Sequence, residues 1–170
     1  QKTTLYNYHK TLGAKFVSFA GYEMPIQYSD GIIKEHIATR SHAGFFDVSH
    51  MGQFYVSGKN LDEALEKIIP ADLKNLKTNQ SKYSFLLNDN GGIIDDLIIT
   101  RTDNGFCIIL NAACKENDVK QISKHLSKDH KNYLNSDLSL IALQGPKAVT
   151  ILEKLIPNVS KLKFMNGNDF

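Results

Sequence analysis

Cysteine and long apolar runs are scarce in this sequence, and both absences narrow the class of protein. The two cysteines, Cys107 and Cys114, form no zinc-binding pattern and are too few for a disulfide framework, so a reducing compartment is the simplest interpretation. No apolar run approaches the length of a membrane span, and we therefore expect no membrane partner. The net charge is only +2 and the lysines form no basic block, which argues against a nucleic-acid partner.

Common catalytic motifs are also missing. The glycine pair Gly91-Gly92 precedes an expected strand rather than a helix, so it cannot form a phosphate-binding loop. The histidines His36, His42 and His50 fall close together, but none has the i, i+4 spacing of a helical zinc pair. No serine or cysteine lies in a recognisable nucleophile motif. We therefore expect no metal site and no nucleophilic serine or cysteine.

The patterns that are present indicate an α+β fold of antiparallel sheets with packed helices. Extended segments are expected at residues 52–58, 83–87, 93–100, 106–110 and 138–143. Helices are expected over residues 30–40, 60–69 and 116–126 and from residue 146 onward. Asn60 and Glu63 are placed to form a capping box. The apolar side of the first of these helices is expected to be Ile32, Ile33 and Ile37, and residues 1–28 are expected to be ordered but irregular.

The most informative segment is the turn at residues 88–92 together with the strand that follows it. That strand is apolar and β-branched, yet it contains the adjacent carboxylates Asp95 and Asp96. Carboxylates are depleted from strands and are costly to bury without a partner. Neighbours on a strand point to opposite faces, so the two aspartates cannot serve one site in the same way. A solvated pair beside the turn and a pair with one carboxylate in a polar pocket both remain open.

Three further residues are candidates for a binding site, and each has an ordinary alternative. Met51 offers a polarizable side chain and Tyr83 a ring with a hydroxyl, but either can be a core residue. Asn111 offers a donor and an acceptor, but it can also cap the end of a strand.

Several blocks of the chain resemble the aminomethyltransferase of the glycine cleavage system, the T-protein. The blocks are FAGYEMPIQY at 19–28, EH with a later Arg at 35–40, FDVSHMG at 46–52, GGIIDDLI at 91–98 and LQGP at 143–146. They occur in the order of the family along nearly the whole chain, and several blocks in order are far more specific than one motif.

The resemblance implies a tetrahydrofolate-dependent enzyme that takes an aminomethyl group from the lipoyl arm of the H-protein. Such an enzyme releases ammonia and forms 5,10-methylenetetrahydrofolate. The resemblance names Asp95 as the catalytic carboxylate, close to the pterin, and gives folate-binding roles to Met51, Tyr83, Asp95 and Asn111. A carboxylate suits this task because it accepts hydrogen bonds and stabilises a developing cationic carbon. By alternation, Asp96 is expected to be structural.

The expected domain organisation also follows from the resemblance. T-proteins are about twice as long as this chain, and we expect residues 1–170 to be their N-terminal folate-binding catalytic region, with the later parts and the C-terminal barrel domain missing. The compartment implied is the cytoplasm of a bacterium or the mitochondrial matrix of a eukaryote.

Two other functions remain open. The first is a relative on the same scaffold, either a folate-dependent demethylase or a folate-binding protein that assists iron–sulfur cluster assembly. The intact blocks around residues 19–28 and 46–52 argue against the demethylases, and the intact GGIIDD block argues against the cluster-assembly relative. The second is a non-catalytic α+β module that binds folate without turnover.

Overall fold

The computed structural model describes residues 1–169, which divide into two compact units. The first unit contains residues 1–50 and 138–162, and the second contains residues 51–137 and 163–169. Every strand pairing between the described strands is antiparallel, which confirms the α+β class expected from the sequence. No helix in the described part of the chain is long and apolar enough to cross a membrane.

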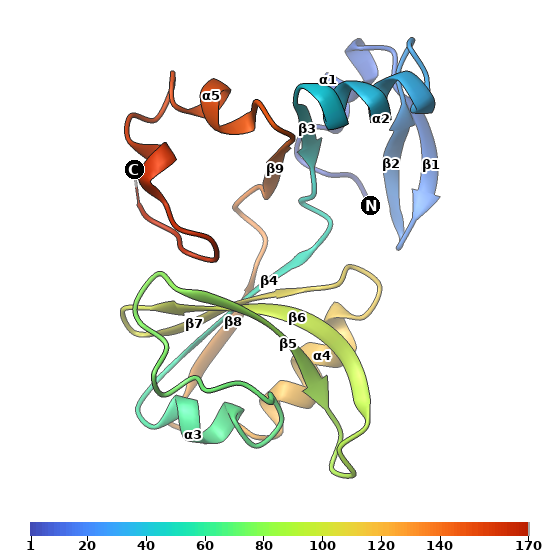
Figure 1. The fold of residues 1–170 in the computed structure, drawn as a ribbon. Helices are drawn as coiled ribbons and strands as arrows, with labels where there is room; N and C mark the ends of the chain where they lie inside the picture. Colours follow the sequence, from blue (N-terminus) through green and yellow to red (C-terminus); the bar gives the residue numbers. More distant parts are fainter. Residues whose placement is uncertain (170) are drawn as a thin grey trace. The chain divides into compact units, whose positions relative to one another are not determined.

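The second unit is built on a five-stranded sheet with the strand order β5-β6-β7-β4-β8 (Figure 1). Its strands are β4 (Gly52–Ser57), β5 (Ser81–Leu87), β6 (Ile93–Thr102), β7 (Gly105–Leu110) and β8 (Lys131–Asn135). Helices α3 (Leu61–Leu65) and α4 (Lys115–Ser123) lie on the same face of this sheet. Strands β5, β6 and β7 are consecutive in sequence and adjacent in the sheet, as expected for hairpin connections.

The core of the second unit lies between the sheet and these two helices. Alternate residues of the central strands point into it and are almost fully buried: Phe54, Val56, Leu97, Ile99, Phe106, Ile108 and Leu110. The helices add Leu61, Leu65 and Ile122. A slip of β6 by one residue would turn Leu97 and Ile99 out of this core, so burial fixes the register of β6. The same register fixes the faces to which Asp95 and Asp96 belong.

Most of the strands predicted for this unit are confirmed within a few residues, but one prediction fails and one strand was missed. Asn60 precedes α3, yet it adopts a left-handed conformation with φ of 55° and its side chain makes no capping hydrogen bond. The capping box is therefore wrong, because an N-cap needs an extended backbone to aim its side chain at the helix. Strand β8 was not predicted, since its sequence is polar. It pairs with β4 at the sheet edge, where the Tyr133 and Tyr55 rings stack 5.2 Å apart.

The first unit contains two small antiparallel pairs and four helical segments. In chain order these are α1 (Tyr6–Thr11), β1 (Lys15–Phe19), β2 (Tyr22–Gln27), α2 (Ile32–Ser41), β3 (Gly44–Asp47), β9 (Ile141–Gln144), α5 (Ala148–Leu152) and the 3-10 helix η1 (Val159–Lys161). Strand β1 pairs with β2, and β3 pairs with β9. Residues 1–28 are ordered, as expected, but they are not irregular: they form α1 and an antiparallel hairpin closed by a tight turn at Ala20 and Gly21, both with positive φ.

The orientation of α2 also differs from the prediction. Ile32, Ile33 and Ile37 were expected to face inward, but they are 51%, 76% and 57% exposed. The inner side of the helix instead carries Glu35, whose Oε1 accepts a hydrogen bond from the Tyr28 backbone N–H at 2.6 Å. This contact ties the inner side of the helix to the residue that follows β2, so the rotation of α2 differs from the one that its apolar residues predicted.

Candidate active site

The turn between β5 and β6 is organised by one asparagine. Asn88 Oδ1 accepts hydrogen bonds from the backbone N–H groups of Asn90 at 3.0 Å and Gly92 at 2.9 Å. Gly91 has φ of 78°, a conformation that favours glycine. The local sequence therefore folds into a compact turn that delivers Asp95 and Asp96 at the start of β6.

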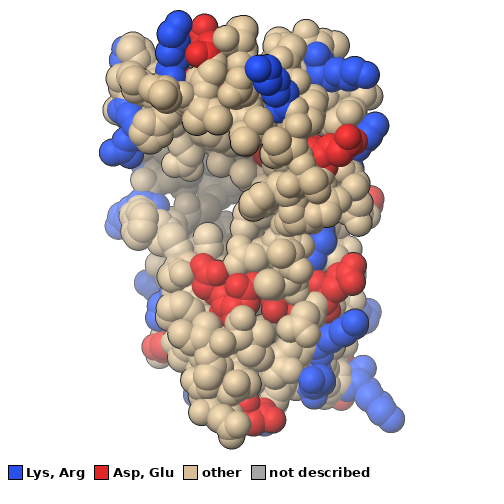
Figure 2. Space-filling view, turned by 90° about the vertical axis from the view of Figure 1, so that its right-hand side faces the viewer, with Lys and Arg blue, Asp and Glu red and all other residues tan. Residues whose placement is uncertain are grey.

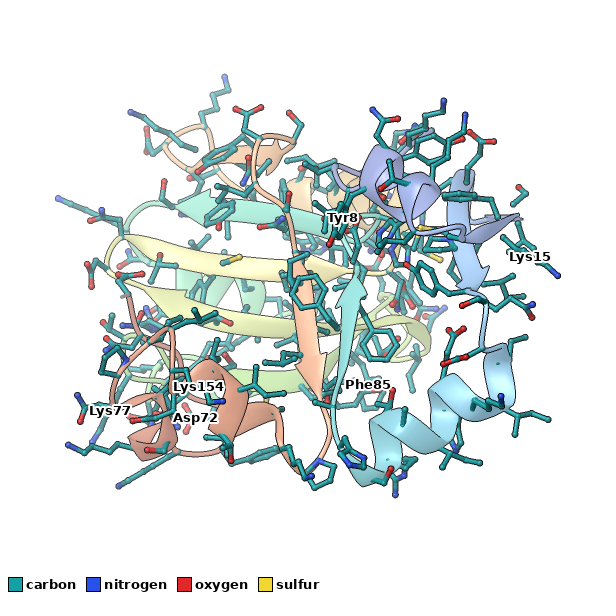
Figure 3. The ribbon with its side chains drawn as sticks, turned by 90° about the horizontal axis from the view of Figure 1, so that it is seen from above. Tyr8, Lys15, Asp72, Lys77, Phe85 and Lys154 are labelled. Atoms are coloured by element: carbon teal, nitrogen blue, oxygen red, sulfur yellow. The ribbon has the colours of Figure 1, made fainter. Side chains whose placement is uncertain are left out.

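Alternation places the two aspartates on opposite faces of the sheet, as the sequence predicts. Asp95 pairs with Leu86 and shares its face with the buried residues Leu97 and Ile99. Asp96 pairs with Phe85, which is labelled in Figure 3. The Phe85 ring meets the Tyr83 ring edge to face at 5.7 Å. Asp95 thus belongs to the face that α3 and α4 cover, and Asp96 belongs to the face that carries Tyr83.

One side chain nevertheless joins both carboxylates. Asn111 follows the last residue of β7, and its Nδ2 donates to Asp95 Oδ1 at 3.0 Å and to Asp96 Oδ1 at 2.7 Å. The backbone N–H of Asp96 also donates to Asp95 Oδ1, at 2.9 Å. Asn111 can reach both faces because it lies beyond the end of the strand rather than within it. The two carboxylates therefore form one hydrogen-bonded unit.

Asp96 makes a second strong contact on the face of the sheet that carries the exposed Tyr83, which we call the open face. The Tyr83 hydroxyl donates to Asp96 Oδ2 at 2.7 Å. This bond, followed by the one from Asn111, lowers the pKa of Asp96 below its ordinary value. The same bond raises the pKa of Tyr83, because it stabilises the protonated hydroxyl. Asp96 is therefore ionised at neutral pH and lies beside an exposed aromatic ring, which is 58% accessible.

Behind Asp95 lies a third carboxylate that the sequence analysis missed. Asp118 of α4 is fully buried, and burial raises the pKa of its carboxyl to about 7, with a further contribution from the Asp95 carboxyl beside it. A signal for it exists in the sequence: Asp118 is four residues before the core residue Ile122, so both lie on one helix face. A carboxylate on the apolar face of a helix needs a partner.

The structure brings together three of the four residues predicted to bind folate: Tyr83, Asp95 and Asn111. The fourth, Met51, is half-buried and immediately precedes β4. Gly52 pairs with Leu110, so Met51 lies at the same end of the sheet as Asn111. Asp96 was expected to be structural and to face away from Asp95. It does belong to the opposite face of the sheet, and it is hydrogen-bonded to both Tyr83 and Asn111.

Other features of the molecule lie away from this group. A cavity of about 540 Å³ in the second unit is lined by residues such as Lys59, Asp62, Arg101 and Asp103, at the opposite end of β6. The described residues contain no group of three or more His, Cys, Asp and Glu side chains that could hold a metal ion. On the face shown in Figure 2, lysines and arginines are dispersed and form no continuous basic patch.

The second unit is an α+β unit whose antiparallel sheet ends in a carboxylate pair that Asn111 bridges. Comparisons with known proteins identify the family to which the chain belongs. Residues 5–170 match the family model described as the GCVT N-terminal domain. The chain therefore belongs to this family.

The similar proteins are aminomethyltransferases. The chain is 42% identical over 175 residues to "Aminomethyltransferase, mitochondrial" of Dictyostelium discoideum, covering 97% of this chain and 43% of that protein. It is 47% identical over 167 residues to the aminomethyltransferase of Chlorobium luteolum, covering 94% and 44%. A crystal structure of glycine cleavage system aminomethyltransferase T from Bartonella henselae superposes with a TM-score of 0.92 at 40% identity, over 98% of this chain and 46% of that one. The chain thus spans under half the length of these relatives.

Proposed function

We propose that this chain forms the folate-binding part of an aminomethyltransferase of the glycine cleavage system. Its reaction takes the aminomethyl group from the lipoyl arm of the H-protein, releases ammonia and forms 5,10-methylenetetrahydrofolate. The observation that carries the proposal is the single Asn111 carboxamide that bridges Asp95 and Asp96, with Tyr83 bound to Asp96. Membership of the family and the similarity to named aminomethyltransferases support the same activity.

The side chains on the open face suit a folate. The Tyr83 ring is exposed and Ile98 beside it is 38% accessible, so together they offer flat apolar surface for a pterin ring. Asp96 accepts hydrogen bonds, and pterin rings carry several N–H donors. Met51, at the same end of the sheet, supplies a side chain that adapts to a flat ligand.

Tetrahydrofolate supplies the nitrogen nucleophile that receives the one-carbon unit, and the chain supplies charge and orientation. The ionised carboxylates stabilise positive charge that develops on the transferred carbon. Asn111 holds the Asp95 and Asp96 carboxyl groups in fixed positions, so little reorganisation is needed during the reaction.

The two aspartates take different parts in this proposal. Asp95, which the resemblance names as the catalytic carboxylate, remains our candidate for that role and fixes Asn111 and the Asp96 backbone through its Oδ1. Its Oδ2 is buried, whereas Asp96 shares the face of the exposed Tyr83 ring. We therefore add Asp96 as the carboxylate that meets the ligand directly.

We propose on the same basis that residues 1–170 are the N-terminal catalytic region of a longer enzyme and that a lipoylated H-protein is its partner. Relatives named as mitochondrial occur in Dictyostelium discoideum and Schizosaccharomyces pombe, and other relatives are bacterial. The compartment would be the mitochondrial matrix in a eukaryote and the cytoplasm in a bacterium.

Calorimetric titration of this chain with tetrahydrofolate tests the proposed site. We expect micromolar binding that weakens by roughly tenfold in Asn111→Ala, because one hydrogen bond to each carboxylate is lost. The exposed turn residue Asp89 provides the control, since Asp89→Asn alters charge in the same hairpin without touching the site. Binding that Asn111→Ala leaves unchanged would contradict this location, and absence of binding even by the gene product that contains this chain would contradict the folate assignment.

A further inference from the structure

Asp118 and Asp95 form a carboxyl pair that the proposed reaction does not explain. Asp118 is on α4 and has no exposed surface, and its carboxyl lies beside that of Asp95 on β6, close enough for the two groups to interact. No N–H or O–H group of residues 1–169 donates to either Asp118 oxygen or to Asp95 Oδ2, and all three oxygens are buried.

This arrangement requires a proton. Two ionised carboxylates can only accept hydrogen bonds, so neither could satisfy the other, and their charges would repel inside the protein. One proton resolves both problems, since a protonated carboxyl donates an O–H to its neighbour. A buried carboxylate without any partner would be strongly unfavourable.

The donors available to each carboxyl decide where the proton lies. Asp95 Oδ1 already accepts two hydrogen bonds, from Asn111 Nδ2 and from the Asp96 backbone N–H, so this carboxyl is supplied with donors. Asp118 receives no such bond from the described residues. The proton therefore belongs on Asp118, in agreement with a pKa for this group of about 7 that burial raises first and Asp95 raises further.

We propose that Asp118 is a positioning residue: its protonated carboxyl donates to Asp95 Oδ2 and so holds the Asp95 carboxylate in the orientation that fixes Asn111. The contacts form a continuous path from Asp118 to Asp95, to Asn111 and to Asp96, which ends at the Tyr83 hydroxyl. Loss of the Asp118 proton places a second negative charge against Asp95 and releases the path at its buried end.

Two other titratable side chains that adjoin the pair are those of Asp96 and Cys114. Asp96 is on the same strand and is bound by Tyr83 and Asn111 on the opposite face. The Cys114 thiol precedes α4 and also lies beside Asp95. Burial first, and then the charges of Asp95 and Asp118, raise the pKa of this thiol, so it stays protonated at neutral pH. Cys114 is thus a neutral neighbour and adds no charge to the pair.

Carboxyl-carbon NMR of this chain, with the aspartates labelled, tests the proton directly and needs no folate. We expect Asp118 to titrate close to neutral pH in the unaltered chain, and the Asp95→Asn variant to move this midpoint down by at least about one pH unit because a charge is removed and an amide donor is added. An Asp118 midpoint near the ordinary 3.8, or one that Asp95→Asn does not move, would overturn the proposal.

The positioning role rests on the proposed function and has a separate readout in tetrahydrofolate affinity. Asp118→Asn keeps a neutral side chain with an N–H donor, so we expect affinity within about twofold of the unaltered chain at pH 6 and little change up to pH 8. Asp118→Ala removes the donor, and we expect affinity to fall by about tenfold. The unaltered chain should lose tetrahydrofolate affinity between pH 6 and pH 8. The control variant Asp89→Asn should lose affinity over the same pH range, like the unaltered chain.

The results separate the two claims. Equal affinities for Asp118→Asn and Asp118→Ala, or a pH dependence that persists in Asp118→Asn, would overturn the positioning role. A near-neutral Asp118 midpoint, together with no folate binding by this chain or by the gene product that contains it, would support the shared proton and count against the proposed function instead.

Discussion

Asp96→Asn and Asp95→Asn should each lower aminomethyl transfer by roughly 100-fold or more, the usual scale for a charged group that acts on the reacting atoms. Asp96→Asn removes the ionised oxygen that shares the open face with Tyr83. Asp95→Asn weakens the same hydrogen-bonded unit on the opposite face, because its amide N–H group would face the N–H donors of Asn111 and of the Asp96 backbone. Residues that act as one unit give losses that are not additive, so the double variant should be little worse than either single one.

The measurement is formation of 5,10-methylenetetrahydrofolate by the gene product that contains this chain, supplied with aminomethyl-lipoyl H-protein and tetrahydrofolate. Asp89→Asn is the matched control, since it removes a carboxylate from the exposed turn a few residues away. Full activity in either Asp95→Asn or Asp96→Asn would show that the two carboxylates do not work together. Fully additive losses would contradict the bridging role of Asn111.

Phe106→Ala should lower the free energy of unfolding of the second unit by about 3–5 kcal/mol, the cost of removing a buried aromatic side chain. The Phe106 side chain has no exposed surface, and the Arg101 guanidinium carbon lies 4.3 Å from the centroid of its ring. The variant therefore creates a cavity and also removes a cation–π contact. The backbone around the cavity is held in place, because the flanking strands β4 and β6 are paired along their whole contact with β7. Neighbouring side chains can therefore do little to refill the cavity.

Urea unfolding of this chain measures the effect. Ile93→Ala is the control, since Ile93 is a large apolar residue of the same unit but is 64% exposed, and its replacement should change stability by less than about 0.5 kcal/mol. A loss below about 1 kcal/mol for Phe106→Ala would mean that the core described here is not what holds the sheet together.

The hairpin that carries the site could be predicted from the sequence because its signals are local. The Asn-Asp-Asn-Gly-Gly turn and the apolar run after it specify both the reversal and the alternation of side chains. Alternation correctly placed Asp95 and Asp96 on opposite faces. It could not show that Asn111 joins them, since that contact depends on how β7 pairs with β6 at a distance of fifteen residues or more along the chain.

The parts that could not be predicted depend on contacts between distant segments. Ile33 and Ile37 suggested an inner face for α2, but both are exposed, and the inner side carries Glu35, which accepts a hydrogen bond from Tyr28. The spacing of Asp118 and Ile122 places Asp118 on the apolar face of its helix, but its partner Asp95 is known only once α4 is placed over that face of the sheet. Buried polar partners are specified by tertiary packing rather than by local propensity, so the sequence alone does not predict them.

The most direct test of the central claim is an NMR titration of this chain with tetrahydrofolate that follows the Asn111 side-chain amide and the Asp96 backbone amide. If folate binds at the carboxylate pair, both signals should shift in a saturable way, and Asp96→Asn should weaken the apparent affinity. If both signals stay in place while the backbone amides of Lys59 and Asp103 shift, folate binds in the cavity at the opposite end of β6 and the proposed site is wrong.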